Sequence, residues 1–164
     1  PGAVALDPLG RFLFVANRIP NNPLVDAFRI GATGTLTAAG TIAMSSFVES
    51  LNVDRTGRFL LAARNDGGVE TLLIDPTTGA LATAAFPPAF APPGTDASTV
   101  AMDATGRFTL VGHGAPGLEP GGGIRTFRIN PATGSLVLAG IVAKSRRPPT
   151  CPAPTSPKAR AAVV

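Results

Sequence analysis

The eleven residues Asp7–Asn17, DPLGRFLFVAN, return with small changes at two later points of the chain. DRTGRFLLAAR begins at Asp54 and DATGRFTLVGH begins at Asp103, so the signature Asp-x-x-Gly-Arg-Phe occurs three times in 164 residues. A signature that returns at a nearly constant interval of this length indicates a repeat protein. The glycines of the signature are 47 and 49 residues apart, at Gly10, Gly57 and Gly106.

A second signature, Thr-Gly-x-Leu, alternates with the first along the chain, with its glycine at Gly34, Gly79 and Gly134. Both signatures are typical of tight turns, because aspartate accepts hydrogen bonds from the backbone that follows it and glycine tolerates a left-handed conformation. Short apolar segments flank both turns and are predicted to be strands. The expected strands cover residues 3–6, 12–16, 25–30 and a run from Leu36; 48–53, 59–63, 69–74 and a run from Leu81; and 98–102, 108–112, 124–129 and a run from Leu136.

Four strands in each repeat of about 48 residues match the four-stranded blade of a β-propeller. The runs FLFVA (12–16) and FLLAA (59–63) do not alternate apolar with polar residues, which favours strands that are covered on both faces by neighbouring blades. A β-sandwich is the second interpretation, because it also has short strands at regular spacing. We therefore expect an all-β chain of three propeller blades, at about 1–46, 47–95 and 96–144.

The composition excludes several classes of function. Hydrophobic residues make up 45% of the chain and charged residues 15%, and no apolar run approaches the roughly 18 residues of a membrane span. There is no Trp or Tyr, which argues against a nucleic-acid interface of basic and aromatic residues. Cys151 is the only cysteine and His113 the only histidine, so neither an intrachain disulfide nor a multi-thiolate or His-rich metal site is expected. We expect no cofactor.

The last twenty residues differ from the repeats. Residues 145–164 are rich in proline and carry a charge of +4, equal to the net charge of the whole chain, on Arg146, Arg147, Lys158 and Arg160. Such a segment is predicted to be a basic, disordered tail. Closed propellers have about 4 to 8 blades, so three blades would leave two apolar outer faces bare. The chain begins with Pro1, and we hypothesise that it is a fragment of a longer propeller or that it self-associates to close a ring.

The paired turns carry a resemblance to a known family. The segments LDPLGRFLFVAN…VDAFRIGATGTL, VDRTGRFLLAAR…VETLLIDPTTGAL and MDATGRFTLVGH…IRTFRINPATGSL resemble the lactonase-family seven-bladed propellers, relatives of 6-phosphogluconolactonase and of bacterial YVTN-type repeat proteins. The resemblance covers residues 1–143 and implies a hydrolase for a small-molecule lactone of a sugar or related acid. The family also contains repeat proteins with no established chemistry, so a non-catalytic propeller that presents its loops to a protein or cell-surface partner is the alternative. The compartment stays open, with an extracytoplasmic location favoured over a cytoplasmic one.

The candidate site lies on the face opposite the two repeated turns, where the loops differ between repeats and function is usually carried. Seven residues after each signature glycine stand Asn17, Arg64 and His113, with Arg18 and Glu49 nearby. Under the lactonase hypothesis, His113 or Glu49 is the general base, and Asn17, Arg18 and Arg64 bind the substrate. Purely structural roles stay open: a strand-end histidine, solvated arginines and a glutamate that protects a strand edge.

The arginines of the signature itself receive a simpler interpretation. Arg11, Arg58 and Arg107 follow the first turn directly, on the face away from the candidate site. We expect them to be solvent-exposed charges that keep the turns soluble. The aspartates of the signature, Asp7, Asp54 and Asp103, are expected to cap the turns.

Overall fold

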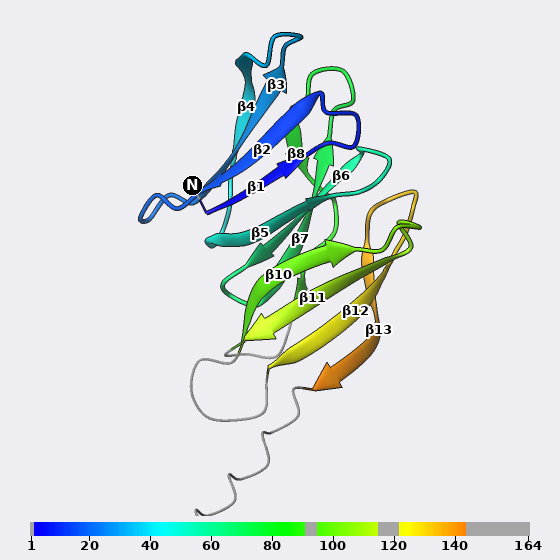
Figure 1. Ribbon diagram of the computed structural model, residues 1–164. Helices are drawn as coiled ribbons and strands as arrows, with labels where there is room; N and C mark the ends of the chain where they lie inside the picture. The colour runs from blue at the N-terminus through cyan, green and yellow to red at the C-terminus, as the bar shows by residue number, and fades with distance from the viewer. Residues whose placement is uncertain (1, 91–94, 115–121, 144–164) are drawn as a thin grey trace, which may run out of the picture.

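The computed structural model of the protein describes residues 2–90, 95–114 and 122–143, which form three antiparallel sheets of propeller type (Figure 1). The expected tail, 145–164, lies outside the described residues. Blade 1 contains β1 (Ala3–Leu6), β2 (Phe12–Asn17), β3 (Leu24–Ile30) and β4 (Leu36–Ala43). Blade 2 contains β5 (Val48–Val53), β6 (Phe59–Arg64), β7 (Gly68–Ile74), β8 (Leu81–Thr83) and the short β9 (Ala89–Phe90), which pairs with β7. Blade 3 contains β10 (Asp96–Met102), β11 (Phe108–Gly114), β12 (Gly123–Ile129) and β13 (Leu136–Ala143).

The strand order within each blade follows the chain, so the sheets are simple up-and-down meanders. The all-β propeller prediction is confirmed, and the strand β9 is an addition that the repeat pattern did not indicate. Because successive strands reverse direction, the two repeated turns of each blade share one face. The loop after β2, the start of β5 and the end of β11 lie together on the opposite face, at the left of Figure 1.

The repeated turns form for the reasons that the sequence indicated. Asp7 Oδ1 accepts a hydrogen bond from the backbone N–H of Phe12 at 2.9 Å, and Asp54 and Asp103 do the same for Phe59 and Phe108 at 2.8 and 2.7 Å. The turn glycines have positive φ angles, which a residue with a Cβ rarely adopts. These angles are 67°, 70° and 71° in the first turn and 81°, 80° and 80° in the second.

Burial separates the middle blade from the outer two. Every residue of β6 is buried, as expected for a strand between two blades. In β2, however, only Phe12, Phe14 and Ala16 are buried, because among the described residues a neighbouring blade covers one face of that strand. The prediction of strands covered on both faces is therefore correct for FLLAA and wrong for FLFVA. The reason is position in the array: the same kind of strand is enclosed in blade 2 and half-covered in blade 1.

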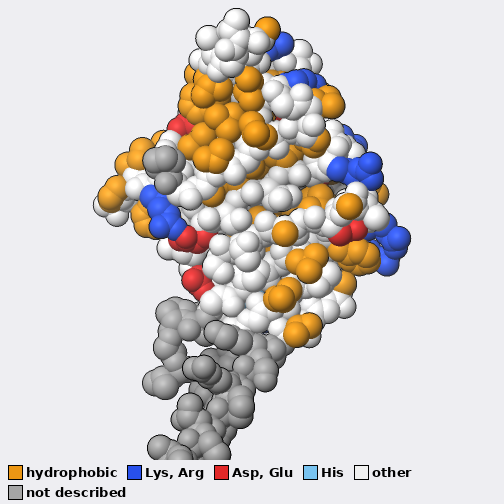
Figure 2. Space-filling model, viewed as in Figure 1, with side chains coloured by type: hydrophobic (Ala, Val, Ile, Leu, Met, Phe, Trp, Pro, Cys, Tyr) orange, Lys and Arg blue, Asp and Glu red, His pale blue; other side chains and the backbone are white. Residues whose placement is uncertain are grey.

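Two hydrophobic cores join the blades. The first lies between blades 1 and 2 and includes Phe14, Val25, Leu60 and Leu72; the second lies between blades 2 and 3 and includes Leu61, Val111 and Phe127. The outer faces of blades 1 and 3 are bare among the described residues, and Figure 2 shows hydrophobic side chains gathered over both ends of the molecule. Exposed large apolar residues on these two sheets include Val4, Leu6, Leu110, Ile124, Val137 and Val142.

The arginines after the first turn are more than solubilising charges. Arg11 Nη1 donates to the carbonyl of Pro76 in blade 2 at 3.2 Å, and Arg58 Nη2 donates to the carbonyl of Pro131 in blade 3. The expectation of purely solvated side chains is therefore wrong for these two residues. Sequence reasoning missed the contacts because each partner lies in the following repeat.

Asp7 makes the stability of blade 1 dependent on acid pH. Burial would raise the pKa of Asp7, but hydrogen bonds from the Phe12 backbone and from the Arg11 side chain and backbone, with the Arg11 charge, lower it below 3.8. A carboxylate with a lowered folded-state pKa stabilises the fold above the unfolded value, and this contribution is lost as pH falls. We expect Asp7→Asn to reduce the difference in stability between pH 6 and pH 3, measured by denaturant unfolding. An unchanged pH dependence would contradict this role.

Candidate functional site

The second strand of each blade ends at the loop-bearing face with a polar residue. Asn17 ends β2, Arg64 ends β6 and His113 lies one residue from the end of β11. All three side chains are on the strand face that looks toward the preceding blade. Arg64 therefore lies at the junction of blades 1 and 2, His113 lies at the junction of blades 2 and 3, and Asn17 lies on the bare face of blade 1.

Arg18 and Glu49 are brought together from different blades. The Arg18 guanidinium forms an ion pair with the Glu49 carboxylate, and their side chains are 48% and 24% exposed. Glu49 sits at the irregularity in register between Val48 and Ser50, where β5 pairs with β6. Bulges of this kind redirect a side chain and are common beside functional sites. The pair joins the loop after β2 to the first strand of blade 2.

Arg64 is buried within a cluster of acidic groups. Its side chain is 3% exposed, and its guanidinium contacts the carboxylates of Asp66 at 2.9 Å and Glu70 at 2.6 Å. Asp66 also accepts a hydrogen bond from the backbone N–H of Gly68 at 3.0 Å. The positive charge of Arg64 is thus balanced within the protein, and Arg64 fixes the β6–β7 connection.

Asn17 belongs to a third, more open group. Its side-chain amide donates to Asp26, and the other oxygen of Asp26 accepts from the Thr41 hydroxyl at 2.6 Å. The three residues come from β2, β3 and β4, so the group ties the loop-facing end of blade 1 together. The amide of Asn17 remains partly exposed.

His113 is the candidate with the most unusual environment. It is 7% exposed, and neither ring nitrogen makes a well-formed hydrogen bond to the described residues. Burial lowers the pKa of His113 below its ordinary 6.5, the charge of Arg125 lowers it further, and Asp96 only partly offsets these effects. These effects favour the neutral form of the imidazole, which can accept a proton.

Two residues beside His113 were not singled out from the sequence. Asp96 pairs with Gly114 in the β10–β11 ladder, one position from His113, and its Oδ1 is buried without a hydrogen-bond partner among the described residues. Arg125 lies on β12, the strand paired with β11 on its other side. Sequence reasoning missed Asp96 because the strand was expected to begin at Ser98, whereas β10 begins at Asp96. The Asp96 carboxylate lies against Gly114, the residue that follows His113 in β11.

The arrangement gives no indication of a metal centre. In the part of the chain that the structure describes, no three His, Cys, Asp or Glu side chains are grouped as metal ligands would be. Within those same ranges no helix is long and apolar enough to cross a membrane.

Comparison with known protein families gives a match to the model described as "Lactonase, 7-bladed beta-propeller", over residues 1–95. The chain belongs to the lactonase family of seven-bladed β-propellers. The matched region contains blades 1 and 2, with the loop-face residues Asn17, Arg18, Glu49 and Arg64. No curated protein matches the sequence.

Solved structures of similar fold agree with this lactonase-family assignment. A putative 6-phosphogluconolactonase from Bacteroides uniformis superposes with a TM-score of 0.67 and 19% identity over 82% of this chain and 38% of its own. One from Bacteroides fragilis gives 0.67 and 23% over 82% and 36%. A periplasmic gluconolactonase from Pseudomonas aeruginosa gives 0.61 and 20% over 87% and 56%. The chain thus spans between about a third and just over half of these proteins, and at such identities the likeness establishes the fold.

Proposed function

We propose that this lactonase-family propeller hydrolyses a lactone of a sugar or related acid, with His113 as the general base. The observation that carries the proposal is the environment of that side chain: a buried imidazole with a lowered pKa and with both nitrogens free of well-formed hydrogen bonds to the described residues. A buried polar group without a partner is costly unless another molecule satisfies it. Water or a substrate oxygen would do so here.

The reaction needs only water and the lactone. One nitrogen of His113 removes a proton from water as the water oxygen bonds to the lactone carbonyl carbon. The ring C–O bond then breaks, and the imidazolium returns the proton to the departing ring oxygen, which gives a hydroxy acid. The charge of Asp96, which raises the pKa of His113, would favour the imidazolium that forms between the two steps.

The remaining residues of the site have supporting roles in this proposal. Arg18 is the cation best suited to an anionic substrate group, because it is half exposed and pairs with a single carboxylate among the described contacts. Glu49 is the second candidate base, and its pairing with Arg18 holds it at the loop face. Asn17 offers an amide donor at the same edge. Arg64, with its charge balanced by two carboxylates, supports the site by positioning the β6–β7 loop.

The test is lactone opening, followed by pH-stat with glucono-δ-lactone and with its 6-phosphate, after subtraction of the uncatalysed rate. We expect His113→Gln to reduce kcat/KM by about 100-fold or more, the typical contribution of a general base. Glu49→Gln tests the second candidate base. Arg55→Ala, on the opposite face, is the control and should leave the rate unchanged. A wild-type rate equal to the uncatalysed rate would contradict the proposal, as would full activity of the His113 variant.

The same assay has a pH signature. Because the pKa of His113 is lowered, the base is deprotonated at neutral pH, and kcat/KM should fall only as pH drops below 6.5. This fall of kcat/KM at low pH should be absent from the His113→Gln variant. If the variant shows the same fall of kcat/KM at low pH, the group that titrates is not His113.

A second candidate function is a non-catalytic propeller that presents its loops to a protein partner. The observation that favours it is the pairing of the polar residues on the loop face: Asn17 with Asp26, Arg18 with Glu49, and Arg64 with Asp66 and Glu70. In that case these contacts would serve to hold loops in place. The absence of lactone opening by a folded chain would favour this function.

A further inference from the structure

In each blade, the polar residue at the loop-facing end of the second strand has a charged neighbour on the third strand. The neighbour pairs in the ladder with the residue two positions before the polar one. The three pairs are Asn17 and Asp26, Arg64 and Glu70, and His113 and Arg125. Residues directly opposite in a ladder, and residues two apart along a strand, project from the same face of a sheet. The two members of each pair therefore lie close together on one face of their blade.

In blades 1 and 2 the neighbour is a carboxylate that bonds to the polar residue. The side-chain amide of Asn17 donates to Asp26, and Arg64 Nη1 donates to Glu70 at 2.6 Å. Each of these pairs joins a donor to an acceptor within the blade. In blade 3 the corresponding position holds Arg125, which has donors and no acceptor. Blade 3 therefore lacks the negative charge that the other two blades have at this place.

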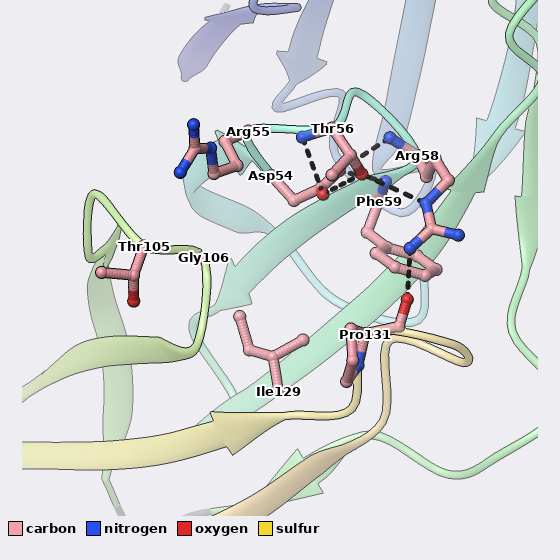
Figure 3. Close-up of a pocket in the computed structure, with 9 residues that line it drawn as sticks. All are labelled: Asp54, Arg55, Thr56, Arg58, Phe59, Thr105, Gly106, Ile129 and Pro131. Carbon is pink, nitrogen blue, oxygen red and sulfur yellow. Dashed lines mark hydrogen bonds between the residues drawn. The ribbon is translucent and has the colours of Figure 1, made fainter.

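Arg125 is the only partly buried arginine of the described residues that forms no ion pair. The other described arginines without an ion pair are exposed: Arg29, Arg55, Arg58, Arg107 and Arg128. Figure 3 shows two of these, Arg55 and Arg58, around a cavity of about 100 Å³ on the turn face, and each donates to a main-chain carbonyl of blade 3. A charge that is withdrawn from water without a partner is costly. Arg125 is therefore suited to bind an anionic group of a ligand.

His113 lies on the same face and also has no partner. Both ring nitrogens are buried, and neither has a hydrogen-bond partner among the described residues. The charges that act on His113 in the described part of the chain are those of Arg125 and Asp96. Asp96 pairs with Gly114 in the ladder and forms no ion pair with Arg125. The side chains that blade 2 contributes to the core of this junction are apolar and include Leu61, Ala63 and Val69.

We propose that Arg125 and His113 form a carboxylate-binding site, which takes the carboxylate of the acid that lactone hydrolysis releases. The ligand's carboxylate stands in blade 3 where the carboxylates of Asp26 and Glu70 stand in blades 1 and 2. Arginine binds carboxylates through charge-assisted and often paired hydrogen bonds. Only the naming of the acid rests on the proposed function; the site itself is built from blades 2 and 3. This carboxylate is a different group of the ligand from the one proposed for Arg18.

The same site acts before the acid is formed. As the water oxygen bonds to the lactone carbonyl carbon and His113 takes the proton, negative charge develops on the carbonyl oxygen, and Arg125 donates a hydrogen bond to it. His113 then returns the proton to the ring oxygen as the ring C–O bond breaks, which leaves a carboxylic acid. The acid loses its proton to water and stays bound to Arg125 as a carboxylate. Arg125 is thus a catalytic residue that also binds the product.

The first experiment measures carboxylate binding separately from activity. Because His113 is the only histidine of the chain, its imidazole signals can be recognised in proton NMR without an assignment of the whole spectrum. Gluconate is added at constant ionic strength, and we expect a saturable shift of these signals in the wild type. Arg125→Gln should weaken gluconate binding about tenfold or more, because the charge-assisted hydrogen bonds are lost. The absence of a saturable shift in the wild type would overturn the proposal, as would equal binding by Arg125→Gln.

The matched control for this binding experiment is Arg128→Gln. Arg128 is exposed and lies three residues further along β12, on the other face of the sheet, so its replacement should leave gluconate binding unchanged. Equal weakening by Arg128→Gln would show a general effect of charge and contradict the site. Inorganic phosphate is the second probe. If phosphate binds and gluconate does not, the site is not one for the product carboxylate.

A charge reversal gives a sharper test. Arg125→Glu supplies blade 3 with the carboxylate that Glu70 supplies in blade 2, and this variant should not bind gluconate because the new carboxylate repels it. The pKa of His113, followed by NMR, should be higher in this variant than in the wild type, since a negative charge replaces a positive one beside the imidazole. A variant that is folded by circular dichroism and binds gluconate as tightly as the wild type would overturn the proposal.

Lactone opening separates a failure of this inference from a failure of the proposed function. Arg125→Gln should reduce kcat about 100-fold, as is typical when an oxyanion donor is removed, and inhibition by gluconate should weaken with it. If the wild type opens lactones through His113 while Arg125→Gln keeps full kcat and wild-type inhibition, this inference is wrong and the proposed function stands. If the wild type binds gluconate through Arg125 but opens no lactone, hydrolysis is wrong and the carboxylate site stands.

Discussion

Replacing Phe59 with alanine should lower the free energy of unfolding by about 3 to 5 kcal/mol, the usual cost of deleting a buried phenylalanine. Phe59 is 4% exposed and lies under the turn glycine Gly134 of the next blade. Its loss removes apolar contacts and also leaves the turn that holds blade 3 unsupported. Because the chain has no Trp or Tyr, the measurement is urea unfolding followed by circular dichroism.

Phe108→Ala provides the matched control for this prediction. Phe108 has the same place in blade 3, but it is partly exposed and lies under no turn among the described residues. Its replacement should cost less than about 1.5 kcal/mol. Equal losses for the two variants would show that the turn of the next blade contributes little to the role of Phe59.

Arg64→Ala should lower the free energy of unfolding by about 3 kcal/mol, because it leaves the partly buried carboxylate of Glu70 without its partner. The Arg64 side chain is 3% exposed, and Glu70, which it contacts at 2.6 Å, is 17% exposed. Asp66 is 36% exposed and is better able to remain solvated when the arginine is lost. The measurement is again denaturant unfolding at neutral pH.

Two further variants test whether the loss of stability comes from leaving a charge unpaired inside the protein or simply from breaking an ion pair. Arg18→Ala breaks an ion pair that is half exposed on the arginine side, and it should cost less than about 1 kcal/mol. Arg64→Met combined with Glu70→Gln removes the buried guanidinium together with its partly buried carboxylate partner and should recover much of the lost stability. If the double variant is no more stable than Arg64→Ala, uncompensated charge is not the cause of the loss.

The fold could be predicted from the sequence because its signals are local. Aspartate and glycine at fixed places define each turn, and the apolar segments between turns have the length of strands, so the predicted bounds of β1 and β5 agree with the structure. The missed element, β9, is two residues long and follows no repeated signature. The error over FLFVA arose because a strand's own residues do not reveal whether a second neighbour covers it.

The candidate site could be predicted less completely. The sequence indicated that Asn17, Arg64 and His113 end equivalent strands, and the structure places them so. It did not indicate that Arg64 is held by Asp66 and Glu70, or that Asp96 lies one ladder position from His113. Those relations depend on which side chains the twist and pairing of the strands bring within a few ångströms. Their roles in catalysis stay predictions until lactone opening is measured.

The sequence by itself determined the turns, the strands and their grouping into three blades, because these rest on contacts between residues that are close in the chain. Only the tertiary structure decided which faces are enclosed and what the repeated arginines do. Arg11 and Arg58 bond to prolines 65 and 73 residues further along. Contacts between residues so far apart in the chain form only when one blade packs on the next. The sequence of a single repeat therefore could not predict them.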